Sequence, residues 1–541
     1  MENKIKRWLD CSDSETAKEL KGLNSDELYD RFYKEVEFGT GGMRGIMGAG
    51  TNRINRYTVA KATLGYARFI KSKNGEERGI VIAYDNRRCS RYFAEVTAGV
   101  LASEGIKSYL FEDIRTTPEL SFSVRELNAF GGIVITASHN PPEYNGYKIY
   151  NESGGQLVPP EIKPILEEMN KIEDELSIPI MAISEAVELV TIIGKEIDEK
   201  YYEKVLSLQF NKSTVKDIKV VYSPEHGTGN VPVRHVLKAA GFDVIPVESQ
   251  CPPDPNFSCT KNPNPEMPEA YEEAIKLMKS ENADLAIATD PDCDRLGVVV
   301  NNGGIPILLT GNQSGAILLY YILSRHKEQG TLPDNAVIFA TVVTSVLGDK
   351  IAEDFGANVE KTLTGFKFIG EKIRVHEEAN DRSFIFGYEE SNGCLIGDFV
   401  RDKDGVQASL MMCEAANYYK KQGKTILHVL DEIYEKYGRY NDLLHSITLK
   451  GEDGNKKIIE IMTRLRERTV NEIAGLQVSE ILDFKKPQIG FPLTDLIIYR
   501  FENGSFVAIR PSGTEPKCKF YYCILDANIN EIRKFFEGEN R

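Results

Sequence analysis

The chain has 541 residues, several times the roughly 100–200 residues typical of one domain, so it is expected to form several domains. Hydrophobic residues make up 41% of it, too many for a disordered protein. Lys and Arg total 66 against 81 Asp and Glu, a formal charge of −15, which argues against a general binder of nucleic acid or anionic membranes. We therefore expect neither partner, and an anionic ligand must meet a local cluster of cations.

The cysteines and the apolar segments predict a cytoplasmic protein. Nine cysteines are scattered without CxxC or Cys/His spacing, so neither a disulfide framework nor a structural zinc site is expected. The opening MENKIKRWLDCSDSE lacks the apolar core of a signal peptide. Apolar stretches such as AVIFATVV and GAILLYYIL are far too short to span a membrane.

Strand-like and helix-like stretches alternate over most of the chain, which predicts α/β domains with mixed, mainly parallel sheets. Three times an amphipathic stretch runs into a glycine and then a short strand, at Gly105, Gly241 and Gly356. Each glycine is expected to end its helix in the left-handed conformation. The repetition indicates three related domains, although helix–glycine–strand also occurs in unrelated α/β proteins.

In each of these units a later apolar strand runs into a polar loop: GGIVITASHN, ADLAIATDPDCD and RSFIFGYEESNG. Such loops lie at the carboxyl edge of the sheet, where ligands bind. The last part of the chain lacks this rhythm, and its ENGS turn predicts a hairpin in a smaller α+β domain. The predicted domains are residues 1–205, 206–312, 313–445 and 446–541.

The first polar loop, TASHNPPEYNGYKIY at residues 136–150, offers a serine as a nucleophile. Ser138 follows the strand directly, and Pro141 and Pro142 stop regular structure after it. A serine needs an activating neighbour, and His139 cannot readily form a hydrolase triad from the next position. A solvated turn serine therefore stays open as the alternative.

The second loop, DPDCDRLG at residues 290–297, predicts a metal site. Asp290, Asp292 and Asp294 alternate, so in an extended segment their carboxylates fall on one side. Three such charges repel one another unless a cation is present, and an all-oxygen cluster suits Mg²⁺. Arg295 and Asn301 stand where an EF-hand needs Gly and Glu, which excludes that motif. A solvated turn is the alternative.

The third loop, GYEESNG at residues 387–393, pairs a carboxylate with a hydroxyl. Glu389 and Ser391 alternate at the end of a strand, an arrangement that suits sugar hydroxyls. An exposed acidic turn is the alternative.

The fourth loop, RPSGTEPK at residues 510–517, has the composition of a phosphate site. Arg510 supplies a planar fork, Ser512 and Thr514 supply hydroxyls, Gly513 lets backbone N–H groups approach, and Lys517 adds charge. Together the four loops provide the ingredients of phosphoryl transfer, in which catalysis is mostly positioning and charge neutralisation.

TASHNP, DPDCDR, GYEES and RPSGTEP occur in the order found in the α-D-phosphohexomutase superfamily, and the chain resembles its phosphoglucomutase branch. FGTGGMRG at 38–45 and SPEHGTG at 223–229 extend the resemblance over essentially the whole chain. The opening RWLDCSDSETAKEL is similar to the phosphoglucomutase/phosphopentomutase subgroup.

The resemblance implies four domains whose loops meet at a central cleft. It implies an isomerase-class phosphotransferase that interconverts glucose 1-phosphate and glucose 6-phosphate through a phosphoserine enzyme and glucose 1,6-bisphosphate. The expected cofactor is Mg²⁺, the expected partner is a small phosphosugar, and the expected state is a monomer or weak homo-oligomer.

The resemblance also assigns residues. Catalysis would involve Ser138, His139, Arg44 and Lys367, with Lys367 the likelier general acid/base. Mg²⁺ would be held by Asp290, Asp292, Asp294 and an oxygen of phosphorylated Ser138. The implied substrate-binding residues are Arg295, Glu389, Ser391, Arg510, Ser512, Gly513, Thr514 and Lys517. His226 would line the same cleft.

Two departures from the family pattern leave alternatives open. Asn392 and Gly393 stand where Gly and His are common, which removes a ring contact, so mannose or pentose phosphates remain alternative substrates. Pro291 and Cys293 replace the usual small residues between the aspartates, and Cys293 is either oxidation-sensitive or packed and inert. A metal-dependent sugar phosphatase and a non-catalytic phosphosugar sensor are the competing functions.

Overall fold

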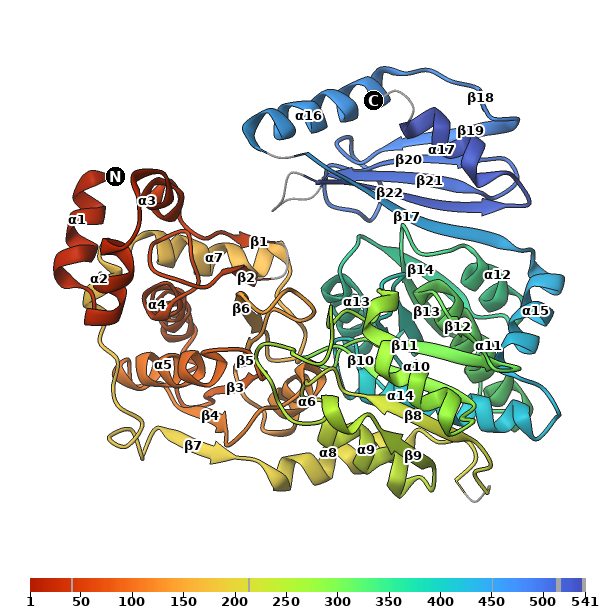
Figure 1. Ribbon diagram of the computed structural model, residues 1–541, viewed down its shortest axis with the longest axis horizontal. Helices are drawn as coiled ribbons and strands as arrows, with labels where there is room; N and C mark the ends of the chain where they lie inside the picture. Colours follow the sequence, from red (N-terminus) through yellow and green to blue (C-terminus); the bar gives the residue numbers. More distant parts are fainter. Residues whose placement is uncertain (40–41, 213–214, 450, 512–516, 538–541) are drawn as a thin grey trace. The chain divides into compact units, whose positions relative to one another are not determined.

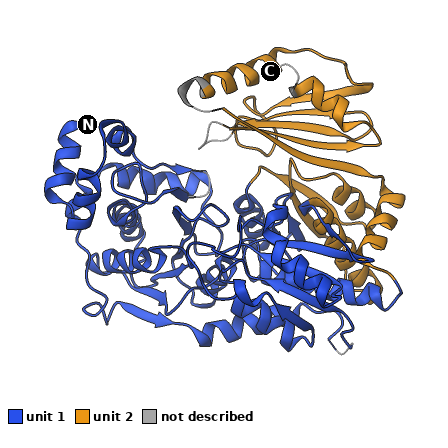
Figure 2. Cartoon of the chain, viewed as in Figure 1, with its two compact units in different colours: residues 1–311, 365–423 blue, residues 312–364, 424–541 orange. Residues whose placement is uncertain are grey.

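The computed structural model describes residues 1–39, 42–212, 215–449, 451–511 and 517–537 (Figure 1). They form two compact units (Figure 2). Unit 1 comprises residues 1–311 and 365–423, and unit 2 comprises residues 312–364 and 424–541. Among the described helices, none combines the length and apolar character that crossing a membrane requires.

Three short helices open unit 1 and pack around the chain's single tryptophan. They are α1 (Glu2–Cys11), α2 (Ser14–Lys21) and α3 (Ser25–Phe32). The Trp8 ring is buried edge-on against Phe32 and Tyr57, and its N–H donates to Glu175 Oε1 at 2.8 Å. This cluster fixes the opening helices to the first α/β domain.

The first sheet has seven strands in the order β1-β2-β6-β5-β3-β4-β7. Strands β5, β3, β4 and β7, at one side of the sheet, are parallel, and the other pairs are antiparallel. The strands are β1 (Phe38–Gly39), β2 (Gly42–Ile46), β3 (Ile80–Tyr84), β4 (Ser108–Phe111), β5 (Gly131–Ile135), β6 (Tyr144–Tyr150) and β7 (Val190–Ile193). The helices are α4 (Arg56–Ser72), α5 (Ser90–Ser103), α6 (Thr117–Glu126) and α7 (Pro159–Asn170).

The second sheet has five strands in the order β12-β11-β10-β8-β9, with β10, β8 and β9 parallel. The strands are β8 (Lys219–Ser223), β9 (Asp243–Pro246), β10 (Leu285–Thr289), β11 (Leu296–Asn302) and β12 (Ile305–Leu308). The helices are α8 (Lys195–Ser207), α9 (Asn230–Ala239) and α10 (Glu272–Ser280). Short 3₁₀ turns lie at Glu175–Ser177, Glu248–Gln250 and Pro268–Tyr271.

Both sheets reverse their winding at the same place. In the first sheet the chain runs from β3 outward to β4 and then returns across β3 to β5. In the second sheet it runs from β8 to β9 and returns across β8 to β10. Ligands of open α/β sheets bind at the carboxyl ends of the strands beside such a reversal. The loop that contains Ser138 (residues 136–143, the serine loop) follows β5, and the loop that contains the three aspartates (residues 290–295, the metal loop) follows β10. Each loop therefore lies at this switch point.

Unit 1 closes with α13 (Phe366–Ala379), the antiparallel pair β15 (Ser383–Tyr388) and β16 (Cys394–Leu395), and α14 (Gly405–Lys420). Unit 2 begins with α11 (Gly311–Gln329), the parallel pair β13 (Ala336–Thr341) and β14 (Asn358–Thr362), α12 (Leu347–Asp354) and α15 (Ile426–Tyr437).

The remainder of unit 2 is a six-stranded antiparallel sheet in the order β17-β22-β21-β20-β19-β18, packed against α16 (Gly451–Glu467) and α17 (Ile529–Glu537). The strands are β17 (Tyr440–Thr448), β18 (Glu472–Ile473), β19 (Leu476–Asp483), β20 (Ile497–Phe501), β21 (Phe506–Pro511) and β22 (Lys517–Leu525). The expected ENGS hairpin joins β20 to β21. The sheet begins at Tyr440, ahead of the domain start expected at residue 446.

The three expected helix-ending glycines are confirmed. Gly105, Gly241 and Gly356 follow α5, α9 and α12, with φ of 72°, 88° and 78°. A Cβ at Gly105 or Gly356 would meet nothing within 4 Å. The left-handed backbone, rather than crowding, is therefore what favours glycine there.

Candidate functional site

Ser138 lies in the loop between β5 and β6 with its side chain buried. Its φ of 52° places a non-glycine residue in the left-handed region, and its N–H donates to Thr136 Oγ1 at 2.8 Å. Its Oγ donates to Asp290 Oδ2 at 2.6 Å. The solvated-turn alternative for Ser138 is therefore wrong, because the hydroxyl is buried against the predicted metal loop.

The three aspartates of the metal loop lie together between β10 and β11. Asp290, Asp292 and Asp294 are buried, and one oxygen of each lies within 4.8 Å of the other two. Asp292 Oδ1 and Asp294 Oδ1 are buried without a hydrogen-bond partner. Buried carboxylate oxygens need a partner, and an all-oxygen cluster with open lone pairs suits a hard divalent cation. These residues therefore fit Mg²⁺.

The pKa values of the aspartates also reflect the burial of several carboxylates close together. Burial and then the charges of Asp294 and Asp292 raise the pKa of Asp290 well above its usual range. Burial acts in the same direction on Asp292, but Lys148, the hydrogen bond with Asp290 and the charge of Lys403 together outweigh it and lower the pKa of that carboxyl. Like charges this close disfavour full ionisation, and a divalent cation would relieve their repulsion.

Two lysines contact the aspartates from other elements. Lys148 Nζ, on β6, donates to Asp292 Oδ2 at 3.0 Å, and Lys403 Nζ lies 3.0 Å from Asp294 Oδ2. Both side chains are largely buried. Because the chain as a whole is acidic, an anionic ligand needs a local cluster of cations, and these two lysines supply part of it.

The loop after β8, SPEHGTG, supports the metal loop through contacts with the backbone of Pro291. Thr228 donates to Pro291 O through both its N–H (2.8 Å) and its Oγ1 (2.9 Å). A Cβ on Gly227 would lie 2.4 Å from the Cα of Pro291, so the two backbones approach closely only because residue 227 is glycine. From the first domain, Thr117 donates through its N–H to Asp292 O and through its Oγ1 to Asp292 Oδ2, both at 2.9 Å.

The predicted sugar loop is tied to its neighbours. Glu389 Oε1 accepts the N–H of Gly365 at 2.9 Å, and burial raises the pKa of Glu389 to about 7. Ser391 follows, half-buried. Asn392 has φ of 63° and donates through Nδ2 to Pro265 O at 3.0 Å. The exposed-turn alternative for Glu389 is wrong, because its side chain is buried.

Gly393 makes room for a lysine. A Cβ at this position would lie 2.0 Å from Lys403 Cδ. The stem of Lys403 thus occupies the space that a side chain at position 393 would need. Lys403 Nζ lies 5.8 Å from the centre of the Phe366 ring.

The predicted basic residues near the serine have different partners. His139 Nδ1 lies 3.2 Å from Ser138 Oγ, and burial and then the charges of Arg295 and Arg44 lower the pKa of His139 well below its usual 6.5. Arg44 Nη1 donates to Asn140 Oδ1 at 2.8 Å. Arg295, directly after the metal ligands, donates to Glu266 Oε1 at 2.5 Å.

Lys367 and His226 have other surroundings. Lys367 is buried at the start of α13, with Nζ 5.3 Å from the centre of the Phe368 ring. His226 Nδ1 lies 2.9 Å from Pro252 O, and its Nε2 accepts the N–H of Cys259 at 3.1 Å. Both ring nitrogens of His226 are thereby engaged by backbone. Burial raises the pKa of Cys293 well above its usual range, which supports the packed, inert interpretation of this thiol.

In unit 2, Arg510 and Lys517 belong to the fourth predicted loop. Arg510 lies near the end of β21, where it pairs in register with Lys519, and Lys517 begins β22. Ser512, Gly513 and Thr514 lie outside the described residues.

The motifs missed several residues around the serine and metal loops. Lys148 stood inside a quoted motif, and Lys403 is a single lysine between two aspartates in RDKD. Arg87 follows the apolar strand GIVIAY in the segment DNRR. A polar segment after an apolar strand was the signal used for the other loops. It would have marked this segment, although not the distant carbonyls that Arg87 binds.

Comparisons with known proteins agree with this fold. The family described as phosphoglucomutase/phosphomannomutase matches through its α/β/α domains I, II and III at residues 35–176, 199–304 and 310–437. A curated phosphoglucomutase of Staphylococcus epidermidis is 38% identical over 95% of both chains. That of Staphylococcus aureus strain USA300 is 36% identical over 97% of this chain and 96% of its own.

Solved structures show the same fold. A phosphoglucomutase/phosphomannomutase family protein from Burkholderia thailandensis superposes with a TM-score of 0.70, 18% identity and coverage of 93% of this chain and 96% of its own. The exocytosis-sensitive phosphoprotein pp63/parafusin of Paramecium, a phosphoglucomutase, gives 0.70 and 17% over 93% and 95%.

The fold and the site define a phosphosugar mutase class of α/β protein. The chain belongs to the phosphoglucomutase/phosphomannomutase family, which confirms the resemblance in the sequence. The expected fold class, three α/β domains with mixed sheets followed by a smaller α+β domain, is also confirmed.

Proposed function

We propose that this chain is a phosphoglucomutase, which interconverts glucose 1-phosphate and glucose 6-phosphate through a phosphoserine at Ser138 and a glucose 1,6-bisphosphate intermediate. The observation that carries the proposal is the 2.6 Å hydrogen bond from Ser138 Oγ to Asp290, within a buried cluster of three aspartates. Relatives named phosphoglucomutase, alike over nearly the full length, supply the substrate class.

In this proposal Asp290, Asp292 and Asp294 hold Mg²⁺ together with an oxygen of phosphorylated Ser138. When bound, the cation supplies charge neutralisation at the phosphoryl oxygens. Ser138 carries the phosphoryl group, and its rigid loop holds Oγ facing the aspartates. Because phosphoryl transfer needs little covalent help from the protein, this positioning is the main task of the loop.

The sugar and its proton are handled by other residues. Glu389 accepts hydrogen bonds from the sugar hydroxyls, and Ser391 donates to them. Arg295, Arg44 and His139 surround the phosphoryl group that is transferred. Lys367 is the proposed general acid/base.

Lys148 and Lys403 are further candidates for moving the proton. Their ammonium groups lie within 3.0 Å of the aspartates, beside the site of transfer.

The second phosphate of the intermediate is assigned to the fourth loop. Arg510, Ser512, Gly513, Thr514 and Lys517 would bind it in both orientations of glucose 1,6-bisphosphate. A cytoplasmic enzyme, monomeric or weakly homo-oligomeric, completes the proposal.

The test is a coupled assay with glucose 1-phosphate, mannose 1-phosphate and ribose 1-phosphate, each with Mg²⁺ and a trace of the matching bisphosphate. We expect the highest kcat/KM with glucose 1-phosphate, together with about one phosphate per chain by intact mass. A higher value with mannose or ribose phosphate would reassign the sugar. Rapid release of inorganic phosphate would favour a phosphatase, and binding without turnover or phosphoserine would favour a sensor.

A further inference from the structure

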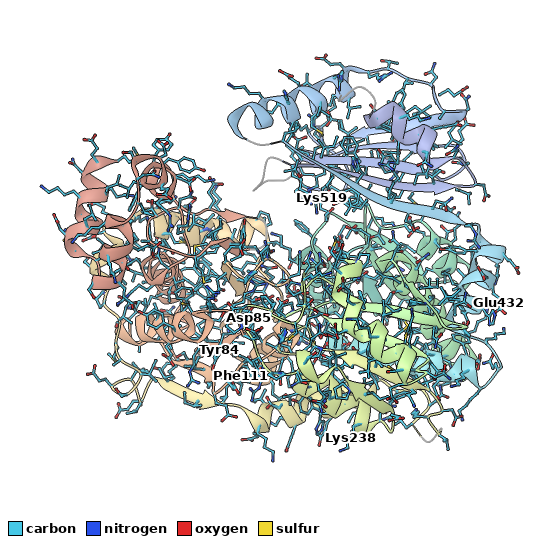
Figure 3. All side chains as sticks on the ribbon, viewed as in Figure 1. Tyr84, Asp85, Phe111, Lys238, Glu432 and Lys519 are labelled. Atoms are coloured by element: carbon cyan, nitrogen blue, oxygen red, sulfur yellow. The ribbon has the colours of Figure 1, made fainter. Side chains whose placement is uncertain are left out.

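The segment that follows β3 lies against the serine loop. β3 and β5 are parallel neighbours, with Tyr84 opposite Ile135, so residues 85–88 and the loop after Ile135 leave the same edge of the sheet side by side. Figure 3 labels Asp85 next to Tyr84 at the end of β3. Neither the sequence motifs nor the proposed function gives this segment a role.

Arg87 inserts its guanidinium group into the serine loop. Its Nη1 donates to Pro141 O at 2.8 Å and to Tyr144 O at 3.1 Å. Its Nη2 donates to Ser138 O at 2.5 Å and also to Asn140 O. One planar fork thus binds four backbone carbonyls within residues 138–144, the last of them at the start of β6, and one of the four is that of the serine itself.

The guanidinium group is held in place from two other directions. Its Nε lies 3.3 Å from Asp85 Oδ2, and both side chains are inaccessible to solvent. Asp85 is in turn fixed through Oδ1, which accepts the Arg87 N–H at 2.9 Å and Ser90 Oγ at 2.7 Å. The ring of Phe257, from the second α/β domain, lies 5.0 Å from the guanidinium carbon. A buried cation with a fixed counter-ion and an aromatic neighbour has little freedom to move.

These contacts help to hold the backbone of Ser138 in the left-handed conformation. A serine in the left-handed region is strained, and such a conformation persists only when its surroundings over-determine it. The β-ladders end before this loop, and Pro141 and Pro142 contribute no N–H donors to it. Arg87 provides donors for four carbonyls of this stretch, of which that of Pro141 also accepts the N–H of Tyr144 at 3.1 Å.

We infer that Arg87, braced by Asp85, is a positioning residue that clamps the serine loop and keeps Ser138 Oγ aimed at the aspartates. The inference rests on the proposed function. The four carbonyls need a planar fork, which lysine lacks: its ammonium carries the same charge but only three donors at a single point. Geometry and charge can therefore be separated by one substitution.

The experiment compares Arg87→Lys with Arg88→Lys. Arg88 is the adjacent exposed arginine, and its side chain bonds Asn256 rather than the serine loop. For each protein we would measure kcat and KM for glucose 1-phosphate, the single-turnover rate of Ser138 phosphorylation by glucose 1,6-bisphosphate, and Tm. Amide hydrogen exchange over residues 137–146 would report the order of the loop directly, without requiring turnover.

We expect Arg87→Lys to lower kcat and the phosphorylation rate about ten- to a hundredfold with KM within about twofold, because misplacing a nucleophile by about 1 Å costs that much. Exchange over residues 137–146 should quicken while that of β3 and β5 stays unchanged. Arg88→Lys should match wild type throughout.

Three results would overturn the inference. These are wild-type transfer in folded Arg87→Lys, a loss of rate that merely follows Tm and recovers on cooling, or a variant that does not fold even in the cold, which would make Arg87 a folding residue. Failure of the proposed function would look different, because wild type itself would then carry no phosphate on Ser138.

Discussion

The loops after β3 and β8 occupy equivalent places in two related sheets, yet they support their neighbours by different means. After β3, the Arg87 side chain reaches into the serine loop and binds its carbonyls. After β8, the backbone itself approaches the metal loop, with Gly227 against Pro291 and Thr228 bonded to the Pro291 carbonyl. In the first sheet the loop after β3 therefore supports the loop after β5, and in the second sheet the loop after β8 supports the loop after β10.

The difference follows from what each supported loop contains. The metal loop carries three carboxylates that Lys148 and Lys403 already contact, and a buried arginine behind it would add a third cation competing with a metal ion for them. Close backbone contact fixes such a loop without adding charge. The serine loop carries no acidic ligand of its own, so a guanidinium group can serve its carbonyls without disturbing the chemistry.

The sharpest way to separate the two loops is to remove the serine hydroxyl. Ser138→Ala should abolish mutase turnover, because the hydroxyl is the only group proposed to accept the phosphoryl group. Intact-mass measurement after incubation with glucose 1,6-bisphosphate should show about one phosphate on wild type and none on the variant.

Metal binding is the control in the same preparation, because the metal loop keeps its own support. Titration with Mn²⁺ should therefore give nearly the affinity of dephosphorylated wild type, which also lacks the phosphoserine oxygen proposed as a metal ligand. Turnover by Ser138→Ala near the wild-type rate would contradict the assignment of the nucleophile.

A change in the metal loop should give the complementary result. Asp292→Asn removes one charge from the cluster and breaks its ion pair with Lys148. We expect weaker Mg²⁺ binding and a fall in kcat of about a hundredfold or more, since charge neutralisation supplies several kcal/mol in such reactions.

Wild-type enzyme treated with EDTA should lose activity and regain it when Mg²⁺ is added. The Asp292→Asn variant should regain it only at higher Mg²⁺. Full activity after exhaustive chelation would contradict a metal role for the three aspartates.

The supported loops were predictable from the sequence, whereas their supports were not. The spacing of Asp290, Asp292 and Asp294 predicts the metal cluster, because alternation alone places the three carboxylates on one side of an extended segment. Arg87 and Thr228 act on residues far along the chain, through a pairing of β3 with β5 and of β8 with β10 that only the strand order reveals.

The same limit explains the errors at single residues. Glu389 was compatible with an exposed turn because the sequence does not show its burial against Gly365. Lys403 was overlooked because the space it uses exists only where Gly393 lacks a side chain. The glycines that end α5, α9 and α12 were predictable, because that requirement is local.

The sugar loop offers a test through pH that neither support loop should affect. Burial raises the pKa of Glu389 to about 7 from an ordinary 4.5, although the charge of Lys403 opposes the rise. Between these values the folded protein holds a proton that the unfolded chain releases, so this residue makes the free energy of unfolding fall as pH rises through that interval.

The ionised form of Glu389, which accepts sugar hydroxyls, dominates only above about pH 7, so kcat/KM should drop about tenfold per unit below it. Glu389→Gln should have a lower kcat/KM at high pH and lack this step. The measurement is a pH profile of kcat/KM for both proteins. An acid limb that survives in Glu389→Gln would assign the titration to another group.

The smallest expected effect comes from breaking the backbone support of the metal loop. In Gly227→Ala the new Cβ would lie 2.4 Å from Pro291 Cα and 2.6 Å from its carbonyl oxygen, both backbone atoms that cannot step aside as a side chain can. Overpacking of this kind costs about 1–3 kcal/mol, so Tm should fall. The displaced loop should also raise the Mg²⁺ concentration for half-maximal activity severalfold, while KM for the sugar phosphate changes little.

Gly22→Ala is the matched control, because its Cβ would meet Glu19 O at an ordinary 3.4 Å in a right-handed backbone. It should leave both Tm and the Mg²⁺ requirement nearly unchanged. If Gly227→Ala lowered Tm without changing the Mg²⁺ requirement, the loop after β8 would be a packing element of the sheet. Its likeness to the Arg87 clamp would then be one of position and not of function.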